Sequence, residues 1–367
     1  MTGIYVHIPF CRSRCIYCDF YSQTSLSLRQ RYIDAVCLEM EMRQNVSPIS
    51  TIYLGGGTPS QLTFAQLEQL FIYINKVYGN HAEEVTIEVN PDDVSPEFAE
   101  CLSQLPVNRV SMGAQTFSDS RLRFLHRRHT AAQLPLAVQR LRDAGIRNIS
   151  VDLMYGFPDE TLDDWKADID AALSLDVEHL SAYALQYEEC TPLYRMLERG
   201  EVCESDEELS RCMYYLLIDR LVEAGYEHYE ISNFAKKGFR SRHNSSYWNQ
   251  TPYIGLGAAA HSFDGKCRQW NVADIMQYME GMEKGEPVVE REELTPDNRY
   301  NEIVMTALRT CEGVSLDMLD DACRAYCLRQ AEPFIKGNLL VLDGWQLRLS
   351  REGLFVSDMV MTELMRV

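Results

Sequence analysis

The sequence predicts an α/β protein, with a partial parallel (β/α)6 barrel followed by a small, winged-helix-like α+β module. Apolar strand-like segments alternate with helical segments over the first part of the chain, which is typical of parallel βαβ units. Six such units are too few to close an eight-stranded barrel, so the sheet is expected to stay open. Near the C-terminal end, helices are followed by two short adjacent strands, which is the pattern of a winged helix.

The predicted barrel occupies residues 1–225. Apolar residues recur three and four apart in residues 64–78, as in a helix, whereas residues 84–91 alternate with period two, as in a strand. The same reasoning places strands at residues 3–8, 50–57, 84–91, 108–117, 146–158 and 177–185. It places helices at residues 28–44, 64–78, 131–144, 162–175 and 201–224.

Residues 226–294 are expected to form a connecting region, and residues 295–367 the C-terminal module. The segment 283–298 is charged and contains Gly and Pro, so it is interpreted as a linker. In the module, helices are predicted at 299–310, 315–323 and 325–336, strands at 338–343 and 345–350, and a last helix from Arg351.

Composition and charge exclude several classes of protein. With 35 Lys and Arg against 54 Asp and Glu, the net charge is −19, so a nucleic acid is not an expected partner and modification of tRNA is disfavoured. The first residues, MTGIYVHIPF, lack the pattern of a signal peptide, and no apolar run reaches the ~18 residues of a membrane-spanning helix. We therefore expect a cytoplasmic protein whose twelve cysteines stay reduced. The choice between monomer and dimer stays open.

Three closely spaced cysteines, Cys11, Cys15 and Cys18, stand in the segment HIPFCRSRCIYCDF with the spacing C-x3-C-x2-C. Structural zinc sites usually close with four ligands, and His7, which would be the fourth, lies within a predicted strand. A cubane iron–sulfur cluster on three thiolates instead leaves one iron free for a small ligand. Cys323 and Cys327 are four apart on a predicted helix and are expected to be buried side chains.

Further candidate residues follow the other predicted strands. The segment LGGGTPS at 54–60 allows close approach of a ligand to the backbone or simply makes a tight turn, and it lacks the Gly-Lys-Ser/Thr of a phosphate loop. Glu88, Gln115 and Asp152 lie near the C-terminal ends of successive strands, the face on which parallel barrels bind ligands. Arg127 follows a short helix and either binds a carboxylate or is an exposed surface arginine.

The cysteine motif, with Tyr17 before its last cysteine, resembles the signature of the radical S-adenosylmethionine (SAM) superfamily. The resemblance implies a [4Fe-4S] cluster on Cys11, Cys15 and Cys18, with one open iron that binds SAM. It also implies that an electron from the cluster cleaves SAM to give a 5′-deoxyadenosyl radical. The segments YVHIPFC, GGGTPS, IEVNP, SMGAQTF, DLMYGFP and GLGAAAHS resemble the coproporphyrinogen dehydrogenase branch (the anaerobic coproporphyrinogen III oxidase family). That resemblance implies SAM contacts at Tyr5, Gly56, Gly57, Thr58, Glu88, Gln115, Arg127, Asp152 and Ala184.

Two departures point to one subgroup of that family. The decarboxylating enzyme has a fourth cysteine where Phe20 stands, and it has an N-terminal extension, whereas the first strand here is predicted about three residues from Met1. Both features resemble the heme chaperone subgroup, HemW, which passes heme to an acceptor protein. The alternative is oxygen-independent coproporphyrinogen III dehydrogenase, which decarboxylates two propionates.

The segment HNSSYWN matches the H-N-x-x-Y-W pattern of that subgroup, which implies heme binding by His243, Tyr247 and Trp248. A histidine supplies an axial ligand to iron, and aromatic rings cover the macrocycle. Residues 236–249 are interpreted as a polar, partly exposed loop, with basic residues for the heme propionates at Lys236, Lys237, Arg240 and Arg242. A histidine simply packed beside aromatics is the alternative, and His261 is a second candidate ligand.

Overall fold

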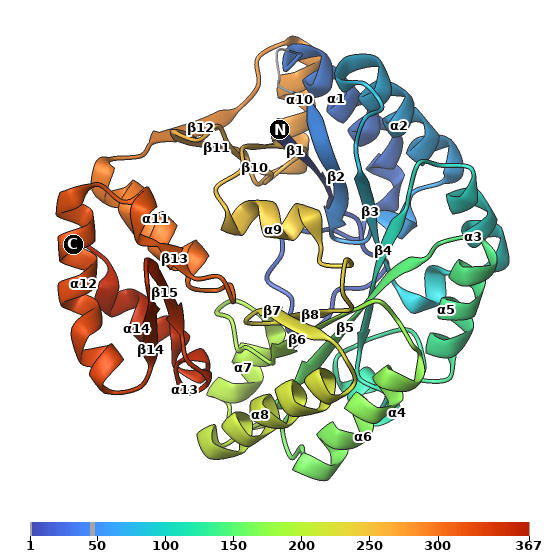
Figure 1. Ribbon diagram of the computed structural model, residues 1–367. Coiled ribbons are helices and arrows are strands. Elements are labelled where there is room, and N and C mark those ends of the chain that lie inside the picture. Colours follow the sequence, from blue (N-terminus) through green and yellow to red (C-terminus); the bar gives the residue numbers. More distant parts are fainter. Residues whose placement is uncertain (1, 45–47, 367) are drawn as a thin grey trace.

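The computed structural model describes residues 2–44 and 48–366 and contains a curved sheet of twelve strands (Figure 1). Its centre is six parallel strands in sequence order: β1 (Thr2–Ile8), β2 (Ile49–Gly56), β3 (Glu84–Val89), β4 (Arg109–Gln115), β5 (Asn148–Tyr155) and β6 (His179–Ala184). The helices on its outer face are α1 (Arg29–Met42), α2 (Phe64–Tyr78), α3 (Pro96–Ser103), α4 (Asp119–Phe124), α5 (Gln133–Asp143) and α6 (Leu162–Ser174). The partial barrel predicted from the alternation is confirmed.

Local sequence signals set the ends of these helices. Thr63 and Gln66 form a reciprocal capping box at the start of α2, and Gly79, with φ of 83°, ends it. Thr161 and Asp164 cap α6 in the same way. Between these caps each helix turns an apolar face onto the sheet, and in α2 that face consists of Leu67, Leu70, Phe71 and Ile74.

The connecting region adds strands to both edges of the parallel sheet. On β6 lies β8 (Asn233–Ala235), antiparallel to it, and outside β8 lies β7 (Glu227–Glu230), which is antiparallel to β8. On β1 lies β9 (Tyr253–Leu256), which is parallel to it, followed outward by β10 (His261–Phe263), β11 (Cys267–Asn271) and β12 (Val289–Glu293). The prediction of a linker at 283–298 is therefore wrong in part, because residues 289–293 pair with β11 as an exposed edge strand.

The connection between β8 and β9 is the short helix α9 (Arg242–Trp248), which lies across the concave side of the sheet (Figure 1). Two further helices follow β6 along the chain, α7 (Pro192–Glu198) and α8 (Glu207–Glu223). The prediction of one helix at 201–224 placed its start too early, because Asp206 caps α8 by accepting from the backbone amides of Glu208 and Leu209. No helix in the described part of the chain is long and apolar enough to cross a membrane.

The C-terminal module has its own core and a three-stranded sheet. After α10 (Ile275–Lys284), which packs on α1, come α11 (Pro296–Ala307), β13 (Val314–Ser315), α12 (Asp321–Lys336), β14 (Leu340–Asp343), β15 (Gln346–Leu349), α13 (Arg351–Phe355) and α14 (Ser357–Leu364). The helix predicted at 315–323 is instead a short 3₁₀ turn, because Asp320 caps a new helix. Cys323 and Cys327 are buried in the core of the module, as expected.

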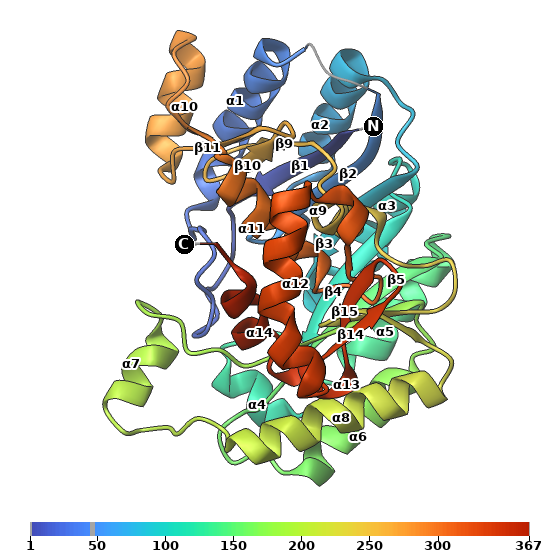
Figure 2. The ribbon, with the colours of Figure 1, turned by 60° about the vertical axis from the view of Figure 1, so that its left-hand side comes forward.

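The module bridges the two ends of the twelve-stranded sheet. At the β7 end, the backbone amide of Cys311 donates to the carbonyl of Tyr229, and the amide of Ile231 donates to the carbonyl of Arg309. At the other end, Arg268 of β11 forms an ion pair with Glu302 of α11. Figure 2 shows α11 and α12 in front of the barrel opening, between β10–β11 above and α8 below. The concave side of the barrel is thus covered by α9 and the C-terminal module together.

Candidate functional site

The cysteine loop joins β1 to α1 at the C-terminal face of the parallel strands. Its base is closed by backbone hydrogen bonds from Cys11 to Gln23 (2.9 Å) and from Gln23 to Pro9 (2.7 Å). Cys11, Cys15 and Cys18 are all half-buried, and burial raises the pKa of Cys11 and raises that of Cys18 to about 11. A metal that bound these thiols would therefore displace protons from them. Phe20 points into solvent, with 64% of it exposed.

The glycine loop after β2 lies flat against β1. Gly56 has φ of 105°, and a Cβ atom there would sit 2.4 Å from the His7 ring. Gly57 donates its amide to the carbonyl of Ile8 (2.9 Å), and a Cβ atom there would lie 2.8 Å from the same oxygen. Glycine is therefore required at both positions by the close approach of two strands of the protein itself.

A chain of polar contacts joins the glycine loop to the cysteines. Thr58 Oγ1 lies 3.4 Å from Cys11 Sγ and accepts from Asn90 Nδ2 (3.3 Å). Arg127 Nη2 donates to Asn90 Oδ1 (2.8 Å), and Nη1 of the same guanidinium lies 3.7 Å from Cys15 Sγ. Sequence reasoning found Thr58 and Arg127 but missed Asn90. The one sequence feature that could have indicated Asn90 is its position two residues after Glu88, in the segment IEVNP.

Two carboxylates stand on neighbouring parts of the barrel interior. Glu88 accepts from the Tyr53 hydroxyl (2.8 Å) and the Gly56 amide (3.0 Å), and burial raises its pKa to about 7. Asp152 accepts from Ser111 Oγ (3.1 Å), and burial raises its pKa as well. Buried Arg109 opposes both increases, and within the described residues its Nε and Nη1 have no hydrogen-bond partner.

The remaining predicted SAM residues lie on β4, β1 and β6. Gln115 ends β4 with φ of 68°, and its amide nitrogen and the Arg127 guanidinium both lie close to Gly113. Tyr5 on β1 has its hydroxyl 3.0 Å from His7 Nδ1, and Ala184 is exposed at the end of β6. His7 Nε2 lies 2.9 Å from the Tyr21 carbonyl, so both of its nitrogens have partners within the protein.

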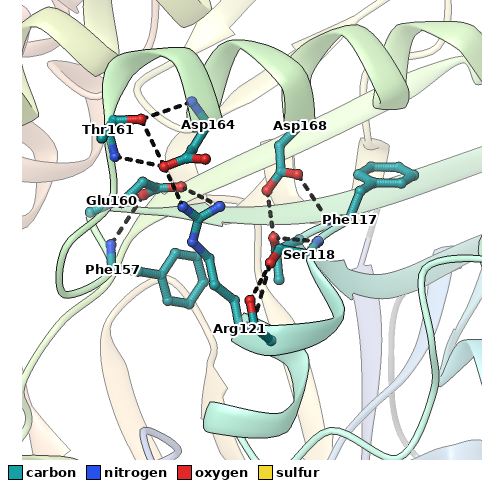
Figure 3. A network of polar contacts seen from close by, with 11 residues as sticks. Phe117, Ser118, Arg121, Phe157, Glu160, Thr161, Asp164 and Asp168 are labelled. Atoms are coloured by element: carbon teal, nitrogen blue, oxygen red, sulfur yellow. Dashed lines mark hydrogen bonds and ion pairs between the residues drawn. The ribbon is translucent and has the colours of Figure 1, made fainter.

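The loop that carries Arg127 is tied to α6 by the network drawn in Figure 3. Arg121 of α4 pairs with Asp164 (2.9 Å) and lies 3.5 Å from Glu160. Glu160 in turn accepts from the amides of Gly156 (2.6 Å) and Phe157 (3.1 Å), and Asp168 accepts from the amide of Phe117 (3.0 Å). These contacts fix α4 on the end of β5, and so fix the start of the turn that leads to Arg127.

The HNSSYWN segment differs from its prediction. The prediction of a loop over residues 236–249 is wrong for Arg242–Trp248, which form the helix α9; the segment is partly exposed as predicted, but His243 itself is only 1% exposed. The cause is a tertiary contact: Glu84 of β3 accepts from the backbone amides of Arg242 (2.9 Å) and His243 (2.8 Å) and so caps the helix from another strand. Ser241 also caps it, by accepting from the amide of Asn244.

Both ring nitrogens of His243 have partners: Nδ1 lies 2.8 Å from Thr51 Oγ1 and Nε2 lies 2.8 Å from the Tyr247 hydroxyl. Burial lowers the pKa of His243 to about 3, so the ring is neutral. It stacks on Tyr53, with 5.1 Å between ring centroids. The alternative of a packed histidine thus describes this conformation, and ligation of heme iron by His243 stays a prediction.

The side chains of Trp248 and of most of the predicted basic residues have partners other than His243. Arg309 of the C-terminal module lies over the Trp248 ring, 4.9 Å from its centroid. Three of the four basic side chains proposed for the propionates have acidic partners instead: Lys236 pairs with Asp176, Arg240 with Glu227 and Glu312, and Arg242 with Glu83. The fourth, Lys237, is exposed and has no ion-pair partner among the described residues. His261 stacks on Trp270, with 5.6 Å between centroids. The predicted SAM residues are thus gathered at one face, whereas the predicted heme residues are divided between two surroundings.

Comparisons with known proteins place the chain in a family. Residues 5–172 match the radical SAM superfamily, and residues 294–356 match the HemN C-terminal domain. The chain is 38% identical to heme chaperone HemW of Bacillus subtilis (strain 168), over 86% of this chain and 85% of that protein. It is 34% identical to heme chaperone HemW of Mycobacterium tuberculosis (strain ATCC 25618 / H37Rv), over 99% and 94%. The chain belongs to the HemW family. Coproporphyrinogen III oxidase (HemN) from Escherichia coli shares the fold, with a TM-score of 0.85, 21% identity and coverage of 99% of this chain and 89% of that one.

Membership of the radical SAM superfamily implies a [4Fe-4S] cluster and SAM, and the residues at the C-terminal face fit both groups. Three half-buried thiols on one closed loop match, in number and kind, the donors that a cluster with one open iron takes, although within residues 2–44 and 48–366 no three His, Cys, Asp or Glu side chains are already arranged to hold a metal ion. After the neighbouring strands, Glu88 accepts from the Gly56 amide, and a carboxylate of this kind can accept a further hydrogen bond from the amino group of an amino acid.

Proposed function

We propose that this protein is a heme chaperone, which binds heme and passes it to an acceptor protein while holding a cluster and SAM. The observation that carries the proposal is the identity of 34–38% to two proteins named heme chaperone HemW, over at least 85% of each chain. The twelve free cysteines support a reducing compartment, so we propose that it acts in the cytoplasm.

We assign the cluster to Cys11, Cys15 and Cys18 within this proposal. SAM is assigned to the backbone of Gly56 and Gly57 and to the side chains of Tyr5, Thr58, Glu88, Gln115, Arg127 and Asp152, with Ala184 at the edge. When reduced, such a cluster supplies an electron to SAM. The part of this chain is to orient SAM: Glu88 is already fixed by Tyr53 and Gly56, and Arg127 by Asn90, so few side chains need to be ordered on binding.

The second candidate is oxygen-independent coproporphyrinogen III dehydrogenase, and the shared fold with HemN favours it. A shared fold does not by itself carry a shared activity. Phe20, at the position where the decarboxylating enzyme has its fourth cysteine, separates this chain from that enzyme.

One preparation tests both candidates. The full chain is reconstituted with iron and sulfide without oxygen, and heme titration is run in parallel with an assay for coproporphyrinogen III decarboxylation in the presence of SAM and reductant. We expect a Soret band that saturates at one heme per chain and no protoporphyrinogen. Repeated turnover to protoporphyrinogen, without heme binding, would replace the chaperone by the enzyme.

A further inference from the structure

Two exposed arginines stand in the cysteine loop itself. Arg12 and Arg14 lie between Cys11 and Cys15, in the segment CRSRC, and the side chains of both are exposed. Neither forms an ion pair with any residue that the structure describes. The turn between the first two cysteines therefore presents two free positive charges to solvent, directly above the thiols assigned to the cluster.

A second group of arginines surrounds a shallow pocket between α4 and α7, and Figure 2 shows α7 extending from the barrel on the side of α4. Arg195 and Arg199 are four residues apart, so they share one face of α7, and both line the pocket together with Arg123 of α4. Arg199 pairs with Glu201 (2.7 Å), whereas Arg123 and Arg195 are exposed and have no ion-pair partner in residues 2–44 and 48–366.

The backbone of Ile16 joins the two groups of arginines. Its amide donates to the carbonyl of Leu125 (3.3 Å), at the end of α4, and its carbonyl accepts from the amide of Leu193 (2.9 Å) in α7. Ile16 follows Arg14 by two residues and itself lines the pocket, with Phe124. The cysteine loop, α4 and the adjacent side of α7 therefore form one continuous surface, which we call the basic face.

The basic face differs in charge from the rest of the chain. Its five arginines stand against two carboxylates, Asp19 of the loop and Glu201 of the pocket, so its net charge is about +3 on a chain of −19. A local field of this sign attracts an acidic partner and orients it toward the cysteine loop. A long polyanion, such as a nucleic acid, would also meet the acidic remainder of the chain and is disfavoured. Apolar groups between arginines, here Ile16, Phe124 and Met196, are typical of protein–protein interfaces.

The kind of partner follows from what a cluster on this loop needs. A cluster that supplies an electron to SAM must receive that electron from outside the chain, and single electrons are carried by flavins and iron–sulfur centres. Complexes that transfer electrons are short-lived and have small interfaces, below about 1,200 Å² in total, so a local charged face is sufficient for them.

We propose that the basic face is the docking surface for a small acidic electron-carrier protein that holds a flavin or an iron–sulfur centre. One electron passes from that centre to the cluster, so the partner is oxidised by one electron and the cluster is reduced by one, and no proton or bond is transferred. The proposal rests on the cluster assigned above to Cys11, Cys15 and Cys18, and it does not depend on heme binding.

The test uses the full chain, with and without its reconstituted cluster, and a flavodoxin of acidic surface as the probe. Calorimetry gives the Kd of the complex at about 50 mM and about 300 mM salt. One variant combines Arg12→Glu with Arg14→Glu, and a second combines Arg123→Glu with Arg195→Glu. The matched control, Arg147→Glu with Lys266→Glu, makes the same change in net charge at two exposed side chains outside the basic face.

At the lower salt concentration, both variants of the basic face should bind flavodoxin about tenfold more weakly than the wild type, with or without the cluster, and the control should stay within about twofold. Binding by the wild type should itself weaken at the higher salt concentration. Reduction of the cluster by reduced flavodoxin, followed by the loss of its visible absorption, should slow in the same variants. Reduction by photoexcited deazaflavin, a small molecule that needs no docking surface, should keep its wild-type rate.

Wild-type affinity in both variants of the basic face would overturn the docking surface, and so would an equal loss of affinity in the control. Tighter binding of a single-stranded RNA than of flavodoxin would also overturn it, in favour of a nucleic acid. Heme titration of the same preparation separates this proposal from the chaperone function. A chain that binds heme but no flavodoxin would contradict the docking surface alone, whereas one that binds flavodoxin at the basic face but no heme would contradict only the chaperone function.

Discussion

Replacing His243 by Ala should destabilise the barrel itself, whatever its effect on heme. The substitution removes a ring that is 1% exposed and leaves two buried groups, Thr51 Oγ1 and the Tyr247 hydroxyl, without their partner at 2.8 Å. Each buried polar group left unpaired costs about 1–3 kcal/mol, and loss of the stacked contact with Tyr53 costs about 1 kcal/mol more. Water entering the polar gap offsets part of this, so we expect a loss of about 3–5 kcal/mol in the free energy of unfolding.

The same substitution, His243→Ala, should also weaken binding of SAM at its predicted site. Tyr53 packs on His243 with one face and donates its hydroxyl to Glu88, which in turn accepts from the Gly56 amide. If removal of the ring lets Tyr53 shift, a coupling of about 1 kcal/mol would weaken SAM binding about fivefold. We would measure unfolding in urea and SAM binding by calorimetry for the wild type, His243→Ala and the exposed-site control His81→Ala.

The control should stay within about 0.5 kcal/mol of the wild type. A loss below about 1 kcal/mol in His243→Ala, together with unchanged SAM affinity, would refute both the burial and the coupling. If the prediction holds, loss of heme binding in this variant cannot be attributed to a lost iron ligand unless its stability is measured as well.

Three further predictions concern the cluster, a carboxylate and a glycine. Cys15→Ala should abolish the broad visible absorption of the reconstituted cluster, whereas Cys323→Ala, in the core of the C-terminal module, should keep it; a full cluster in Cys15→Ala would contradict the assignment. The pKa of Glu88 in the folded chain is about 7, above its ordinary value of 4.5, so the folded chain holds this proton more tightly than the unfolded chain does. The free energy of unfolding should therefore fall as the pH rises from about 4.5 to 7, by at most about 3 kcal/mol. Glu88→Gln should remove this component from urea unfolding measured at pH 5 and pH 8, and an unaltered pH dependence would argue against a buried carboxyl. Gly56→Ala should lower the free energy of unfolding by about 2–4 kcal/mol, because φ at this position is 105° and the new Cβ meets the His7 ring. The control Gly225→Ala has φ of 87° but open space around it, so it should lower that free energy by about 1 kcal/mol. Equal losses in urea unfolding would show that the contact with His7 is unimportant.

The central fold could be predicted because its signals are local. The six parallel strands are apolar and the helices between them carry capping boxes and a period of three to four, as in α2. The strands β7 to β12 were largely missed, because they have only three to five residues each and their pairing depends on neighbours far along the chain. The helix α9 was taken for a loop because its seven residues are polar and its cap, Glu84, lies on another strand.

The same distinction applies to the site. The spacing of cysteines and the ends of strands are visible in short stretches of sequence. The cysteines, Gly56, Glu88 and Asp152 could therefore be chosen from the sequence as candidate site residues. The groups that orient them, Asn90 and Tyr53, act through contacts between strands, and no periodicity marks them. Burial of His243 could not be foreseen either, since it follows from the position of α9 against β2 and β3.

The two strands that flank the parallel sheet make the boundary at residue 225 a poor place to cut the chain. β8 covers the edge of β6 and β9 covers the edge of β1, where Gly3 pairs with Tyr253, so a fragment ending at 225 would carry six strands with two bare edges. Bare edges offer unpaired backbone groups to other chains, and such a fragment should aggregate during expression. During synthesis, β1 is made long before β9, the strand that pairs with its outer edge. Pairing between strands so far apart in the sequence is slow to form, so we expect the chain to need molecular chaperones until β9 has paired with β1.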